Sequence, residues 1–193
     1  MQHEFDIYQL AFEKVLMIQP FSASDNRGVL TKDYAEGIFH ENGVDFFPRE
    51  IITIESRRGV LRGLHFQTTN GQGKILRCVY GKVWCVIVDL RLDSRTFGEW
   101  INVDINQQRG VYIPTECAVG TLAIENSVII CLHSREYDGN FEAGILWDDF
   151  DLNIDWPVEL IEGNIIICEK DKKLQTFADY KKVLERRQSK RSH

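Results

Sequence analysis

The chain has little proline, little methionine and no long hydrophobic run. Four prolines and two methionines occur among its 193 residues. No apolar stretch approaches the roughly 18 residues that a membrane-spanning helix needs. The first residues, Met1 to Asp6, lack the basic and then apolar pattern of a secretory signal. We therefore expect no membrane segment and a cytoplasmic location.

An excess of positive charge is also absent. The chain has 23 Lys and Arg against 29 Asp and Glu, which gives a formal net charge of −6. Proteins that bind nucleic acid usually carry a basic surface, so the overall charge gives no reason to expect a nucleic-acid partner. An anionic ligand would need a local pocket of cationic side chains.

The cysteines form no recognisable pair. There are five, an odd number, and no two have the C-x-x-C spacing of a redox or zinc motif. Four of them lie in apolar runs. We expect reduced thiols, as in a protein of a reducing compartment, and no zinc site. The residues are Cys78, Cys85, Cys117, Cys131 and Cys168.

Short β-branched and apolar runs dominate the middle of the chain, and Gly, Asn, Asp or Pro bounds each of them. Runs of this length and spacing predict a sandwich or barrel of antiparallel strands. Tyr80-Gly81-Lys82 is expected to be a tight hairpin turn between two strands. No linker or repeat divides residues 1–193, which predicts a single all-β domain. The expected strands are 51–54, 59–67, 74–80, 83–90, 100–105, 110–113, 121–125 and 128–132.

The end of the chain changes character. Apolar residues recur at approximate helical spacing between Lys172 and Arg187, which predicts a short C-terminal helix. The last ten residues, 184–193, are rich in Lys and Arg. They could bind phosphate or nucleic acid, but a frayed, solvated tail is the preferred interpretation.

The nonapeptide Gly59-Val60-Leu61-Arg62-Gly63-Leu64-His65-Phe66-Gln67 carries the densest chemical signal. It places Arg62 and His65 three residues apart in a predicted strand, and Lys74 opens the next strand. Two cations and an imidazole suit an anionic substrate that loses a proton. The alternative is structural, because a single histidine in a strand is often a satisfied core residue.

Further motifs stand on both sides of the nonapeptide in a fixed order along the chain. Together they resemble the dTDP-4-dehydrorhamnose 3,5-epimerase family of nucleotide-sugar enzymes, from about residue 15 to residue 175. The resemblance implies a cupin-type jelly-roll β-barrel that needs no cofactor, and a homodimer that exchanges N-terminal strands. The motifs are Asp25-Asn26-Arg27-Gly28, residues 59–67, Gln72-Gly73-Lys74, Val88-Asp89-Leu90-Arg91, Tyr112-Ile113-Pro114, Trp147-Asp148-Asp149, Ile154-Asp155-Trp156-Pro157 and Lys170-Asp171.

The resemblance also implies roles for individual residues. Its substrate is a nucleotide-diphosphate 4-keto-6-deoxysugar whose C3 and C5 protons are acidified by the keto group. His65 would be the base, Asp171 would orient its imidazole, and Lys74 would stabilise the enolate oxygen. Arg27 and Arg62 would hold the diphosphate. Without the resemblance, Asp171 reads as a solvated loop carboxylate.

Other positions depart from the family pattern. The tyrosine that donates the proton in the family is replaced by Cys131, and a histidine of the site is replaced by Val119. Glu50 stands where the family has a glutamine. A thiol could donate a proton, but so could water or His133, and Cys131 could also be a core residue.

Three further positions complete the expected substrate-binding site: Glu50, Gln67 and Tyr137. The lysine Lys32 replaces an acidic residue of the pattern. A metal-dependent cupin is the rival within this fold, but the metal-binding His-x-His pair reads His65-Phe66-Gln67 here. We therefore expect no metal.

Three functions remain open at this point. The first is epimerisation at C3, at C5 or at both carbons of a nucleotide-linked 4-keto-6-deoxysugar, for deoxysugar or polysaccharide biosynthesis. The second is a ketoisomerase that moves the carbonyl between C3 and C4. The third is a non-catalytic nucleotide-sugar binder that lost its proton donor.

Overall fold

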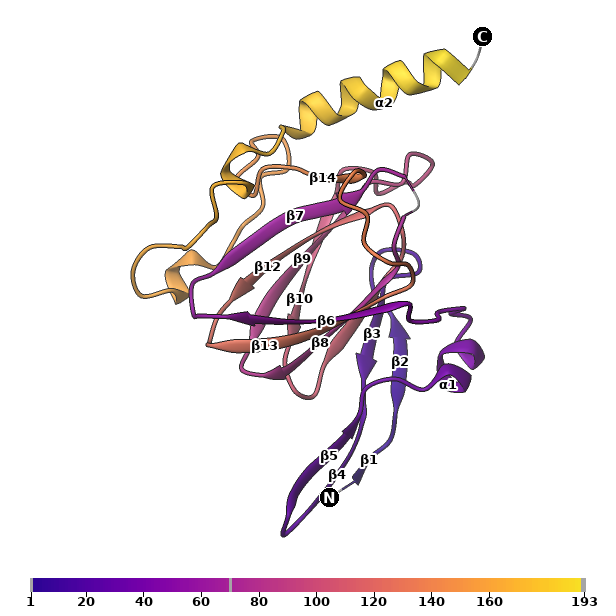
Figure 1. The fold of residues 1–193 in the computed structure, drawn as a ribbon, viewed down its shortest axis with the longest axis vertical. Coiled ribbons are helices and arrows are strands. Elements are labelled where there is room, and N and C mark those ends of the chain that lie inside the picture. The colour runs from indigo at the N-terminus through magenta and orange to yellow at the C-terminus, as the bar shows by residue number, and fades with distance from the viewer. Residues whose placement is uncertain (1, 70, 192–193) are drawn as a thin grey trace.

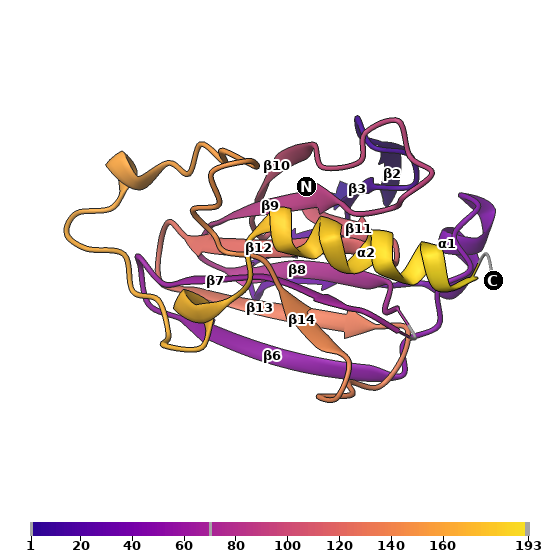
Figure 2. The same cartoon turned by 90° about the horizontal axis from the view of Figure 1, so that it is seen from above.

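Two antiparallel sheets face each other in the computed structural model, which describes residues 2–69 and 71–191 (Figures 1 and 2). In spatial order, the five-stranded sheet contains β10 (Trp100–Ile105), β9 (Val83–Asp89), β12 (Cys117–Ala123), β7 (Leu61–Gln67) and β14 (Glu142–Gly144). The six-stranded sheet contains β2 (Asp6–Gln9), β3 (Leu16–Gln19), β11 (Gly110–Ile113), β8 (Lys74–Tyr80), β13 (Ser127–His133) and β6 (Glu50–Ser56). The predicted jelly-roll barrel of the cupin type is confirmed.

A small third sheet projects from the barrel. It consists of β1 (Gln2–His3), β4 (Phe21–Asp25) and β5 (Gly28–Lys32), and Figure 1 shows it extending away from the two main sheets. The short helix α1 (Glu36–Glu41) follows it. No alternation of buried and exposed residues marks β5 in the sequence, because it is exposed along its whole length and has no buried face.

Strands that are consecutive in the chain often lie in opposite sheets. The predicted hairpin at Tyr80-Gly81-Lys82 is therefore wrong, because β8 belongs to the six-stranded sheet and β9 to the other. Gly81 has φ +76°, and an added Cβ would lie 2.1 Å from the backbone oxygen of Asn126. The glycine serves a tight corner between the sheets rather than a hairpin.

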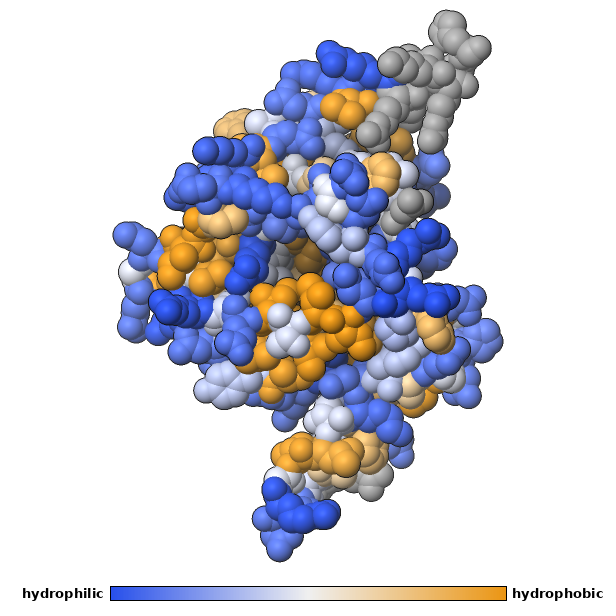
Figure 3. All heavy atoms as spheres, in the orientation of Figure 1, coloured by the Kyte–Doolittle hydropathy of each residue, from blue (hydrophilic) through white to orange (hydrophobic). Residues whose placement is uncertain are grey.

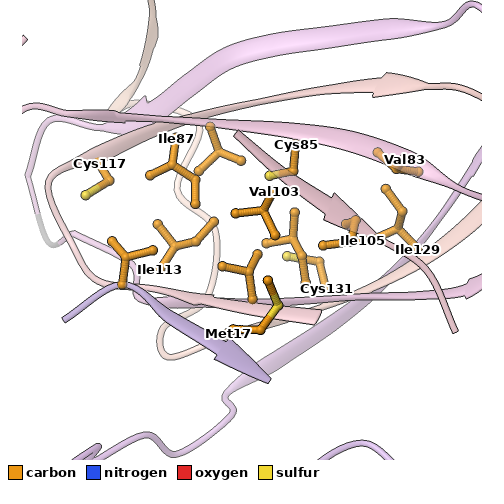
Figure 4. Close-up of a cluster of buried hydrophobic side chains, with 14 of the residues drawn as sticks. Met17, Val83, Cys85, Ile87, Val103, Ile105, Ile113, Cys117, Ile129 and Cys131 are labelled. Carbon is orange, nitrogen blue, oxygen red and sulfur yellow. The ribbon is translucent and has the colours of Figure 1, made fainter. Parts of the chain in front are cut away.

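The strand β9 shows why its sequence is apolar at every position. Val83, Cys85 and Ile87 point into the barrel and join the cluster drawn in Figure 4. The alternate residues pack instead under the C-terminal part of the chain, against Trp156 and Phe177. A strand that is buried on both faces reads as a continuous apolar run.

The C-terminal helix differs from the prediction. The helix α2 runs from Phe177 to Arg191, and residues Asp171–Lys173 form a separate 3-10 turn, η2. The Thr176 hydroxyl accepts a hydrogen bond from the Asp179 backbone at 3.1 Å, which caps the helix start. The basic end predicted as a frayed tail is thus helical through Arg191. In the described ranges, no helix is long and apolar enough to span a membrane, and all five cysteines are free thiols.

Candidate active site

A cavity of about 580 Å³ opens between the two sheets. One wall is β7 of the five-stranded sheet, and the facing wall is formed by β6, β8 and β13. Figure 3 shows hydrophobic surface gathered around a hollow in this part of the molecule. The volume falls in the range of pockets that hold a small molecule or cofactor. Its polar lining includes Arg62, His65, Lys74, Cys131, His133 and Asp171.

His65 and Asp171 form a pair on one wall. The His65 Nε2 lies 2.9 Å from Oδ1 of Asp171, and the Gly63 N–H donates to Oδ2 at 3.0 Å. Burial raises the pKa of Asp171, but the hydrogen bonds from Gly63 and His65 outweigh it, so its pKa lies below the usual value. An ionised Asp171 holds the imidazole proton on Nε2 and leaves the lone pair on Nδ1.

The alternative that placed Asp171 in a solvated loop is wrong. Only 2% of this residue is exposed, because η2 turns the chain back under β7. The sequence around it, Glu169-Lys170-Asp171-Lys172-Lys173, is charged throughout and gave no sign of burial.

Gly63 lies at a point where the backbone leaves no room for a side chain. It has φ +101°, and an added Cβ would lie 2.4 Å from the Val119 carbonyl oxygen and 2.9 Å from the Cα of Gly120. The same residue supplies the N–H that binds Asp171. The local backbone geometry and the orientation of the base therefore depend on one glycine.

We expect Gly63→Ala to lower the free energy of unfolding by at least about 2 kcal/mol, since it combines backbone strain with a clash against main-chain atoms. Thermal unfolding measures the change. Gly37→Ala is the matched control, because Gly37 lies in α1 with no atom within 4 Å of an added Cβ. Equal stability of the two variants would contradict this description of Gly63.

Lys74 lies on the wall that faces His65. It opens β8, next to His133 on β13 in the strand register. Burial lowers the pKa of the Lys74 ammonium, and the neighbouring Cys131, Cys85 and Glu142 oppose that shift. A partly desolvated cation in a mostly apolar cavity is well suited to stabilise developing negative charge.

Three side chains on the facing wall are joined in a row. The Cys131 Sγ lies 3.1 Å from His133 Nε2, and His133 Nδ1 lies 2.8 Å from Glu50 Oε2. Burial lowers the pKa of His133, although the bond to Glu50 opposes the shift. Burial also raises the pKa of the Cys131 thiol to about 12. At neutral pH the imidazole is therefore neutral and the thiol keeps its proton.

The rim of the cavity carries polar and charged groups. Arg62 is exposed and donates hydrogen bonds to the Ser56 hydroxyl and to the Glu55 carbonyl. Gln67 donates to the Asp138 carbonyl at 3.1 Å. Arg62 thus places one exposed cation at the mouth of the cavity.

Tyr137 lies on the same rim. Its hydroxyl donates to Glu142 at 2.6 Å, and Lys170 pairs with the same carboxylate. Burial raises the pKa of Glu142, but the bonds from Lys170 and Tyr137 outweigh it and hold its pKa below the usual value.

Arg27 is not brought to this cavity within one chain. It lies at the turn between β4 and β5, where its side chain is 86% exposed and pairs with Asp25. Glu50 reaches the cavity only through His133. The structure thus gathers most of the predicted residues in one place and leaves Arg27 on the projecting sheet.

Sequence reasoning missed the connections of two residues. His133 was considered only as a possible proton donor, although residues two apart in a strand share a face and Cys131 is two residues away. Lys170 was noted only as part of a motif. Its pairing with Glu142 joins segments 28 residues apart, and no local pattern in the sequence predicts that contact.

Comparison with known proteins agrees with this geometry. The profile of the dTDP-4-dehydrorhamnose 3,5-epimerase family matches residues 9–179. The chain belongs to this family. It is therefore a family isomerase built on the cupin fold, as the ordered motifs indicated.

Individual relatives cover most of the chain. The dTDP-4-dehydrorhamnose 3,5-epimerase of Methanothermobacter thermautotrophicus is 38% identical over 172 residues, which are 88% of this chain and 92% of that protein. The crystal structure of the Legionella pneumophila epimerase with dTDP-4-keto-L-rhamnose is 28% identical, with a TM-score of 0.84 over 90% of this chain and 93% of that one. A 3'-monoepimerase from Streptomyces bikiniensis in complex with dTDP-quinovose is also 28% identical, with a TM-score of 0.81 over 95% and 98% of the two chains.

Proposed function

We propose that the protein epimerises a dTDP-linked 4-keto-6-deoxysugar at C3, at C5 or at both carbons. The observation that carries the proposal is the pairing of His65 with a buried Asp171 across a cavity from Lys74. The structure of one relative contains dTDP-4-keto-L-rhamnose, and that of another contains dTDP-quinovose. The cavity has space for a hexose, and the exposed Arg62 guanidinium at its rim suits the diphosphate of the nucleotide.

The proposed reaction begins at His65. Its Nδ1 lone pair removes a proton from the carbon next to the keto group, and the C–H electrons move into an enolate. Negative charge develops on the keto oxygen, where the Lys74 ammonium stabilises it. A proton that returns to the opposite face of the carbon inverts its configuration.

The function is tested by incubating the protein with dTDP-4-keto-6-deoxyglucose in D₂O and following the sugar by NMR. We expect deuterium at C3 or C5 together with an inverted configuration at the same carbon. Lack of exchange with this sugar and with a panel of other 4-keto nucleotide sugars, at enzyme levels that give rapid turnover for an active relative, would refute the proposal.

The same spectra separate the other two functions. A ketoisomerase would move the carbonyl from C4 to C3, whereas an epimerase leaves it in place. A non-catalytic binder would show micromolar affinity by calorimetry and no exchange at any carbon. The buried Asp171 counts against a binder, because binding alone has little use for an oriented base.

We propose also that the protein acts as a homodimer in a reducing cytoplasmic compartment, which its free thiols suit. The support for a dimer is the projecting β1–β4–β5 sheet. On β5, Val29 is 71% exposed and Leu30 is 62% exposed, and Figure 3 shows a hydrophobic patch on this projection. Strand exchange would cover these residues and would bring Arg27 of the partner subunit towards a cavity.

We expect the double variant Val29→Asp, Leu30→Asp to be a monomer in light scattering, with the wild type a dimer. Buried charges at a subunit interface are strongly unfavourable, so the two subunits should no longer exchange their N-terminal strands. Val158→Asp is the control, since Val158 is 44% exposed and lies outside the projecting sheet. A monomeric wild type at micromolar concentration would contradict the dimer.

A further inference from the structure

The facing wall of the cavity contains a chain of three groups that the reaction described so far does not use. Cys131 and His133 lie two residues apart on β13, and Glu50 is paired with His133 across to β6. The sulfur lies 3.1 Å from His133 Nε2, and Nδ1 of the same ring lies 2.8 Å from Glu50. Each member therefore contacts the next.

The chain of groups leads from solvent to the cavity. The side chain of Glu50 is 28% exposed and that of His133 is 8% exposed, while Cys131 is 4% exposed and lines the cavity. Figure 4 shows the Cys131 side chain pointing into the interior between the sheets. The row thus runs from a partly exposed carboxylate to a sulfur that lines the cavity.

Burying these polar groups costs free energy that a well-packed apolar trio would not. Only one placement of the protons satisfies all three groups, because each hydrogen bond fixes which atom of the next group donates and which accepts. The Glu50 carboxylate accepts the imidazole proton on Nδ1, so Nε2 has a lone pair that accepts the S–H bond of Cys131. Its thiol is protonated at neutral pH, which is the state that a proton donor needs.

We propose that Glu50, His133 and Cys131 form a proton relay that returns a proton to the sugar carbon on the face opposite His65. This inference rests on the proposed epimerase function. Cys131 is the catalytic residue of the relay, because its sulfur faces the cavity. His133 and Glu50 are positioning residues that act through it.

Every proton that the relay moves has a source and a destination. His65 takes the C–H proton, and the enolate carbon takes the Cys131 proton while the C4 carbonyl re-forms. The S–H bond breaks, and its electrons stay on sulfur as a thiolate. A solvent proton then reaches His133 Nε2 from the cavity, which both side chains line, Glu50 stabilises the transient imidazolium, and Nε2 passes the proton to the sulfur. His65 releases its proton to solvent, which restores both walls.

The relay is tested by measuring exchange and inversion separately in D₂O. In Cys131→Ala, His65 still removes the proton, exchanges it with solvent and returns deuterium to the same face. We expect inversion to fall at least 100-fold, while deuterium incorporation with retained configuration continues. Cys131→Ser keeps a dissociable proton and should recover part of the inversion.

Matched variants separate the relay from simple packing. Cys85→Ala removes a buried thiol from the same interior cluster, outside the cavity lining, and should leave the ratio of inversion to exchange unchanged. His133→Asn should lower that ratio about 10-fold at unchanged KM. His133→Gln, whose side-chain oxygen can accept the S–H bond near the position of Nε2, should restore part of it.

Failure of the relay can be told apart from failure of the proposed epimerase function. If wild-type protein exchanges no deuterium, the proposed function fails first. If wild type inverts the carbon and Cys131→Ala inverts it at the same rate, the relay is wrong and the donor is another group such as Lys74 or water. If exchange and inversion fall together by one factor in a folded Cys131→Ala protein, Cys131 does not act on the return step, and the relay is equally overturned.

Discussion

Replacing His65 with alanine is expected to lower deuterium incorporation at C3 and C5 by about 10²–10⁴-fold, the contribution of a general base. The reason is that His65 is the cavity-lining imidazole with an ionised carboxylate behind it. The other imidazole of the cavity, His133, is engaged by Cys131 and Glu50. The rate is measured by NMR in D₂O with saturating sugar nucleotide.

His40→Ala serves as the control for this variant. His40 lies on α1, is 75% exposed at its side chain and pairs with Asp45 away from the cavity. It should exchange at the wild-type rate. Exchange in His65→Ala within tenfold of wild type would show that another group removes the proton.

Asp171→Asn is expected to lower exchange by about 10³–10⁴-fold while the protein stays folded, as found when a buried carboxylate partner of a catalytic histidine is made neutral. The Gly63 N–H must still find an acceptor, so the amide oxygen turns to it. The amide NH₂ then faces His65 Nε2 and requires a lone pair there. The proton moves to Nδ1, and the nitrogen that should act as base loses its lone pair.

The tautomer can be read directly by ¹⁵N NMR of the imidazole, which should show Nε2–H in the wild type and Nδ1–H in Asp171→Asn. Asp89→Asn is a suitable control. Asp89 is also fully buried and bonded to Arg91, Ser94 and Thr96, but it is not part of the cavity lining. The Asp89→Asn variant should have a lower free energy of unfolding and should keep the wild-type rate of deuterium exchange per folded molecule. A wild-type rate in Asp171→Asn would contradict the tautomer argument.

The strands of the barrel were predictable because their faces are buried in a regular way. β8 and β10 begin and end at the predicted residues. The pairing was not predictable from local pattern, as the corner at Gly81 shows. A glycine turn between two apolar runs is compatible both with a hairpin and with a crossing between sheets, and only the packing of the whole barrel decides.

The base half of the site could be predicted from sequence, and the facing wall could not. His65 and Lys74 lie in motifs whose spacing carries the resemblance, and the structure places both on the cavity. The link from Cys131 through His133 to Glu50 spans two strands that are 83 residues apart at the His133–Glu50 contact. Such contacts follow from strand register, which the separate segments do not reveal.

The position of Arg27 illustrates a different limit. Its motif implied a contact with diphosphate, yet its side chain lies on the projecting sheet of its own chain. In the proposed dimer, a site shared between subunits would leave Arg27 far from the other site residues of its own chain.

In the proposed mechanism, the sugar ring lies between two walls that transfer protons. A crystal structure of the protein with a dTDP-linked 6-deoxysugar tests it most directly. We predict the reacting carbon about 3–3.5 Å from His65 Nδ1, the distance of a reactive complex. We also predict the Cys131 sulfur on the opposite face of the ring and Lys74 at the C4 oxygen. A sugar ring bound outside the cavity, or with His65 and Cys131 on the same face, would contradict the account.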